Sequence, residues 1–131
     1  MKPKFSALLA VAAFAIALPV AAHHSFAAEY DAKAQVEIDG TVTKVEWTNP
    51  HAHFYIDVMG PDGKMVNWNF EVGSPNLLSR NGWTRKSIQA GDKVHVVGSR
   101  AKDGTPTASA SLMKLPSGQA FTLTGAQQGK K

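Results

Sequence analysis

Four of the five histidines of the chain fall into two pairs that could bind a metal ion. The hairpin pair, His51 and His53, is two residues apart in an alternating segment, so both side chains point to one face of a strand. The amino-terminal pair, His23 and His24, follows small residues of the kind that signal peptidase requires. Neutral imidazole suits copper, zinc and nickel. An amino-terminal histidine adds its own amine as a ligand, and this arrangement favours copper(II).

Glu71 is the acidic residue best placed to support the hairpin pair. Residues 65–72 alternate apolar and polar like residues 51–58, and the turn sequence Gly60-Pro61-Asp62-Gly63 between the two runs predicts a β-hairpin. Glu71 would then lie opposite His51 or His53, depending on register, as a ligand or as a group that orients an imidazole. Three further polar residues share this outer face and could contact a ligand or support the histidines: Tyr55, Asn67 and Asn69.

Structural roles also fit the histidines. The hairpin pair follows Asn49-Pro50, so it could cap a strand and bond to loop carbonyls. The amino-terminal pair could be flexible residues that the peptidase tolerates. A joint site needs residues 23–35 to fold back over the hairpin, which an extended chain of roughly 3.3 Å per residue permits. The fifth histidine, His95, is expected to be a lone surface residue.

Other kinds of chemistry have weaker support. The chain has no cysteine, which excludes disulfides, thiolate metal sites and cysteine nucleophiles. Neither Ser25 nor Ser74 lies in a nucleophile elbow, and the sequence has no glycine-rich phosphate loop. A non-enzymatic role is therefore favoured over an enzymatic one, although a small copper-dependent redox protein remains an alternative.

Residues 1–22 have the layout of a cleaved signal peptide. Lys2 and Lys4 precede an uncharged apolar run over residues 7–18, and Val20-Ala21-Ala22 predicts cleavage before His23. The run is shorter than the about 20 residues needed to span a bilayer, although a retained anchor is the alternative. We therefore expect a periplasmic protein with no membrane insertion after cleavage.

Cleavage also changes the charge. Lys+Arg falls from 14 to 12 against 10 Asp+Glu, which leaves a net charge near +2. Nucleic-acid binding usually needs a clustered basic face, so no nucleic-acid partner is expected.

The elements that would position the hairpin pair are short strands. Alternation predicts strands near residues 36–47, 51–58, 65–72, 94–98, 108–112 and 120–123. The first strand changes phase, which predicts a bulge near Thr43 and Lys44. Ser74-Pro75 predicts the start of a short helix that ends at Asn81 before Gly82.

The predicted fold class is all-β. Five or six short strands with one short helix between strands three and four fit a small OB-like barrel, with a flat β-sandwich as the alternative. We expect an N-terminal arm over residues 23–35, the barrel over residues 36–124 and a disordered tail over residues 125–131.

The sequence resembles a family of small exported bacterial proteins labelled as a domain of unknown function. The resemblance covers nearly the whole processed chain and is carried by these segments: His23-His24-Ser25-Phe26, Gly40-Thr41-Val42, Trp47-Thr48-Asn49-Pro50-His51-Ala52-His53, Trp68-Asn69-Phe70-Glu71, Gly82-Trp83 and Gly91-Asp92. The resemblance implies a periplasmic location and an OB-like barrel, and it brings no established activity.

Two classes of function are left for a binding module. The first is a periplasmic, non-enzymatic module that holds a divalent transition metal, with copper favoured, through His23, His24, His51 and His53 and with Glu71 as the supporting acid. The second is a metal-free OB-type interaction module for an envelope peptide, glycan or small molecule. That partner would then be recognised by His51, Tyr55, Asn67 and Asn69, and these residues would not support a metal site.

Overall fold

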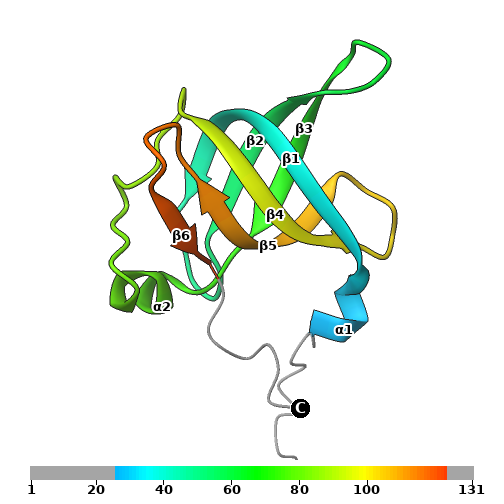
Figure 1. Ribbon diagram of the computed structural model, residues 1–131. Coiled ribbons are helices and arrows are strands. Elements are labelled where there is room, and N and C mark those ends of the chain that lie inside the picture. The colour runs from blue at the N-terminus through cyan, green and yellow to red at the C-terminus, as the bar shows by residue number, and fades with distance from the viewer. Residues whose placement is uncertain (1–25, 124–131) are drawn as a thin grey trace, which may run out of the picture.

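The computed structural model describes residues 26–123 of the chain (Figure 1). The elements, in order, are α1 (Phe26–Glu29), β1 (Tyr30–Glu46), β2 (His53–Met59), β3 (Met65–Glu71), α2 (Pro75–Arg80), β4 (Lys93–Ala101), β5 (Thr107–Lys114) and β6 (Ala120–Thr122). The predicted signal peptide, the amino-terminal pair His23 and His24, and the predicted tail lie outside the described residues.

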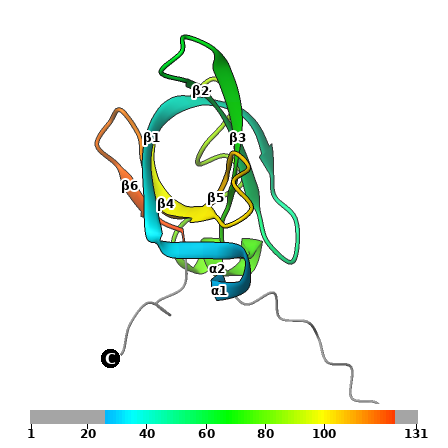
Figure 2. The same ribbon diagram turned by 90° about the vertical axis from the view of Figure 1, so that its right-hand side faces the viewer.

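Five strands form a closed ring. The sheet order is β3-β2-β1-β4-β5-β6, and a parallel pairing of β3 with β5 closes the ring (Figure 2). The long β1 makes closure possible, because its first part pairs with β4 and its last part pairs with β2. The predicted all-β, barrel-like fold is confirmed, and the helix α2 lies between β3 and β4 as expected.

Two bulges bend the strands of this ring. In β1 the register shifts between Val42 and Lys44, which confirms the predicted bulge. A second bulge lies in β5, where Ser111 is the extra residue between Ala110 and Leu112, which pair with Gly98 and Val97 of β4. A Cβ at Gly98 would lie 2.4 Å from the backbone oxygen of Ser109, so only glycine allows β4 and β5 to approach this closely.

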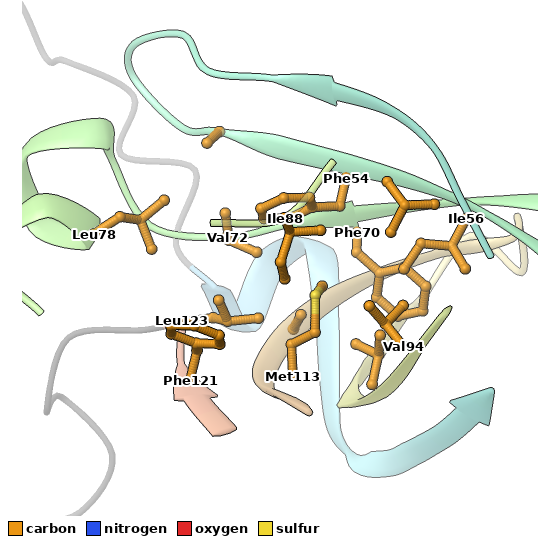
Figure 3. Close-up of a cluster of buried hydrophobic side chains, with 14 of the residues drawn as sticks. Phe54, Ile56, Phe70, Val72, Leu78, Ile88, Val94, Met113, Phe121 and Leu123 are labelled. Carbon is orange, nitrogen blue, oxygen red and sulfur yellow. The ribbon is translucent and has the colours of Figure 1, made fainter. Parts of the chain in front are cut away.

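The core fills the ring with the inward residues of the predicted hairpin. Phe54 and Ile56 of β2 and Phe70 of β3 are fully buried, as the alternation predicted. They lie against Val94 and Met113 from the opposite strands (Figure 3). Since these side chains leave the odd-numbered residues of β2 and β3 on the outer face, the core fixes which face carries His53.

The helix α2 begins as expected at Ser74. The Ser74 hydroxyl accepts a hydrogen bond from the Leu77 backbone N–H at 3.2 Å, and Pro75 opens the helix. Leu78 is fully buried, so α2 adds its apolar face to one end of the core.

The first and fifth strands differ from the sequence-based expectations. β1 begins at Tyr30, so the described part of the predicted arm is α1 and the start of a strand paired with β4. The reason is that Tyr30 is buried, with 6% of its surface exposed, although its neighbours in sequence are polar. In β5, Met113 points inward in place of Leu112, because Ser111 is an extra residue in the pairing with β4 and shifts the phase of β5. Within residues 26–123, no helix is long and apolar enough to cross a membrane.

Candidate functional site

The hairpin pair lies at the base of the β2–β3 hairpin. His53 opens β2 and is paired in register with Glu71, the last residue of β3. His51 precedes β2 in the loop that leaves β1. The intervening Ala52 is buried and exchanges backbone hydrogen bonds with Val72 and Gly73, at 3.0 and 3.1 Å. This bonding holds the end of the loop beside β3 and places His51 next to Glu71.

Glu71 uses both carboxylate oxygens within this cluster. Its Oε1 lies 2.9 Å from Nδ1 of His51. Its Oε2 accepts a hydrogen bond from the Tyr30 hydroxyl at 2.7 Å. Although Glu71 is paired in register with His53, its side chain therefore contacts His51. Of the two roles left open by the sequence, ligand or orienting group, this geometry fits the orienting role.

Tyr30 is a site residue that the sequence-based reasoning missed. Burial, followed by the hydrogen bond to Glu71, raises the pKa of the Tyr30 hydroxyl far above its usual range. The hydroxyl therefore stays protonated and keeps donating to Glu71. One of the two carboxylate oxygens is fixed in this way, and the other remains directed at His51.

His53 is held by an amide instead of a carboxylate. Its Nδ1 lies 2.9 Å from the Asn69 side-chain oxygen, which can only accept a hydrogen bond. In a neutral ring Nδ1 therefore carries the proton and Nε2 carries the free lone pair, and the same holds for His51 against its carboxylate. Neither Nε2 atom bonds to a residue in the part of the chain that the structure describes. Asn69 is thus placed to orient the ring of His53.

Tyr55 is next to the pair but acts on a different acid. The His53 and Tyr55 rings stack with centroids 6.5 Å apart. The Tyr55 hydroxyl donates to Oε2 of Glu46 at 3.1 Å, and the Lys44 ammonium bonds to the other oxygen of the same carboxylate. These bonds, with that of Lys44 the larger, lower the pKa of Glu46. Glu46, which sequence reasoning also missed, is thereby kept ionised beside His53.

Asn67 lies away from the histidines. Its amide nitrogen donates to Oδ1 of Asp57 at 2.8 Å and to the Thr43 hydroxyl at 3.1 Å. Asn67 is two residues closer to the tip of the hairpin than Asn69, and it ties β3 to β2 and β1. Its amide nitrogen therefore bonds within the sheet and not to His51 or His53.

The hairpin pair alone is an incomplete metal site. Within residues 26–123, no group of three or more His, Cys, Asp or Glu side chains is arranged to hold a metal ion. The pair would need ligands from elsewhere. The described chain begins close by, because the Phe26 ring lies 5.6 Å from the ring of Tyr30, whose hydroxyl contacts Glu71.

The expectation that His95 is a lone surface residue is wrong. Its Nδ1 lies 2.8 Å from Asp39, and its Nε2 lies 2.9 Å from Glu37. Both acids are on β1 and His95 is on β4, so the ring bridges two paired strands. The hydrogen bond to Asp39, followed by that to Glu37, raises the pKa of His95 above its usual value of 6.5.

This bridge predicts a pH-dependent contribution to stability. Because the folded-state pKa of His95 is raised, its stabilising effect is fully present below the unfolded-state pKa. The effect is lost as the pH rises through the folded-state pKa. We expect the Tm difference between wild type and His95→Gln to be larger at pH 5 than at pH 8. The comparison cancels titration at the other histidines, and equal Tm differences at the two pH values would show that the bridge carries no charge.

The fold and site together define a small all-β barrel with an oriented histidine pair on its outer face. The sequence matches the model of a Family of unknown function (DUF6152) over residues 10–110. This match covers well over half of the chain, so the chain belongs to that family. The resemblance to a family of unknown function is thus confirmed. No curated protein matches the chain.

Proposed function

We propose that this chain is an exported, periplasmic binding module, not an enzyme, and that it holds a divalent transition metal ion, with copper favoured. The ligands are the hairpin pair, His51 and His53, together with the amino-terminal pair, His23 and His24. Glu71 and Asn69 orient the hairpin pair and are not ligands. The export step rests on the signal-type layout of residues 1–22.

The orientation of the two imidazoles is the observation that carries the proposal. Histidines that bind metals commonly donate one ring N–H to a carboxylate, a carbonyl or water, which fixes the tautomer and leaves the other nitrogen for the metal. Glu71 and Asn69 each supply such an oxygen, both at 2.9 Å from Nδ1. A purely structural capping role would not require both Nε2 lone pairs to be left free.

The amino-terminal pair supplies the ligands that the barrel lacks. From Phe26, three residues of extended chain reach at most about 10 Å back to His23. The Phe26 ring packs on Tyr30, and Tyr30 is bonded to the same carboxylate that holds His51. Cleavage before His23 would free its amine, so amine and imidazole nitrogens would complete a nitrogen-rich site of the kind that copper(II) prefers.

Removing the charge of Glu71 tests the orienting role. The variant Glu71→Gln is expected to weaken copper(II) binding by about 10- to 100-fold, the range typical for partners that orient metal-binding histidines. The affinity is measured by competition with a chelator of known strength, on the chain processed to begin at His23.

The matched control is Glu37→Gln, which makes the same chemical change at the acid beside His95 and should leave the copper affinity unchanged. An equal effect of the two variants, or no effect of Glu71→Gln, would remove Glu71 from the metal site.

A further inference from the structure

Two methionines are exposed at the tip of the β2–β3 hairpin, which projects beyond the ring (Figure 1). Met59 and Met65 are directly paired across the hairpin and are 60% and 55% exposed. Met113, in contrast, is fully buried in the core. Methionine is among the residues most often buried, so a paired and exposed set calls for an explanation other than core packing.

The pairing brings the two sulfur-bearing side chains close together. The Gly60 N–H donates to the Lys64 carbonyl at 2.8 Å, which makes the next pair inward, Met59 and Met65, a non-hydrogen-bonded pair. In such pairs the Cα atoms are about 4.5 Å apart and the side chains approach most closely. Because residues that are directly opposite each other lie on one face of a sheet, both thioethers project from the same face of the hairpin.

The hairpin face that carries this methionine pair also carries an acid, Asp57. Met59 and Met65 border an open hollow of about 610 Å³ that is also lined by Asp57 and Asp39. Asp57 is one pair further down the same hairpin face and is bonded to Asn67. The hollow also has basic groups, Lys93 and His95 from β4 and Lys114 from β5, so it is not acidic as a whole, and Asp57 is the acid that belongs to the hairpin itself.

We propose that Met59 and Met65 form a binding site for a soft monovalent cation, copper(I) in particular. Thioether sulfur is a soft, polarisable ligand, and soft ligands select copper(I) over hard cations. His53 and Met59 are six residues apart on β2, which corresponds to about 20 Å at the rise of a strand. One ion cannot use both sites, so the methionine site is separate from the histidine site and does not depend on it.

Silver(I), a monovalent soft cation that does not change oxidation state, is the probe for this site. The processed chain beginning at His23 contains three methionines, Met59, Met65 and Met113, which are labelled with ¹³C at their methyl groups. We expect silver(I) to shift the methyl resonances of Met59 and Met65 in a saturable titration and to leave that of Met113 in place. Unmoved resonances of Met59 and Met65 at saturating silver(I) would overturn the proposal.

Two double variants separate the methionine site from the histidine site. Met59→Leu/Met65→Leu keeps the apolar volume but removes the sulfur atoms, and it should lose competition for copper(I) against a chromogenic chelator. His51→Ala/His53→Ala should keep the silver(I) shifts of both methionines. If the leucine variant binds copper(I) as tightly as wild type, the methionine pair is not the site, whatever the result for copper(II).

Discussion

The double variant His51→Ala/His53→Ala is expected to lose the ordered copper(II) site and to bind copper no better than an unstructured peptide containing histidine. The physical reason is that both Nε2 ligands of the barrel are removed at once, while Glu71 and Asn69 are left with no imidazole to orient. Electron paramagnetic resonance at substoichiometric copper(II) measures the loss. Unchanged spectra would mean that the hairpin pair does not bind the ion.

The control for this variant is His95→Ala. It removes the same type of side chain from the outer face of the same barrel, where both ring nitrogens are already bonded to acids. His95→Ala should keep the wild-type copper spectrum. Loss of the copper(II) spectrum in both variants would indicate weak binding spread over the surface histidines. It would count against a defined site at the hairpin pair.

Phe70→Ala is expected to have the largest effect on stability, a loss of about 3–5 kcal/mol in the free energy of unfolding. Phe70 is fully buried, stacks on Trp68 and belongs to β3, the strand that closes the ring against β5. Its removal leaves a cavity in a small core that no disulfide supports. Chemical denaturation followed by Trp fluorescence measures the change.

Phe26→Ala is the matched control for Phe70→Ala. Phe26 is the same residue type but is 38% exposed and contacts the barrel mainly through Tyr30. Phe26→Ala should lower the free energy of unfolding far less than Phe70→Ala does. A comparable loss in the free energy of unfolding of the two variants would show that Phe70 is not a buried core residue of the ring.

Much of the fold could be predicted from the sequence because strand side chains alternate with a period of two. The inward face of the hairpin, carried by Phe54, Ile56 and Phe70, follows directly from this alternation. The bulge after Val42 is visible as a change of phase. The start of β1 was missed, because only Tyr30 is buried there and the residues from Asp31 to Gln35 are polar residues and alanines with no large apolar side chain.

The candidate site was predicted less completely, because its contacts join residues far apart in sequence. The Tyr30 hydroxyl reaches Glu71, 41 residues away, and His95 reaches Asp39, 56 residues away. Only the register of closed strands creates such pairs, and no local pattern indicates them. The register pairs His53 with Glu71, but the loop before β2 brings His51 into contact with the Glu71 carboxylate.

The copper(II) titration of the wild-type chain that begins at a native His23 tests the central claim most directly. We expect one ordered, nitrogen-rich site per chain in the electron paramagnetic resonance spectrum, and we expect that site to be lost when one residue is added before His23. Binding no tighter than that of an unstructured peptide containing histidine, or a spectrum indifferent to the added residue, would contradict a site shared by the amino terminus and the barrel.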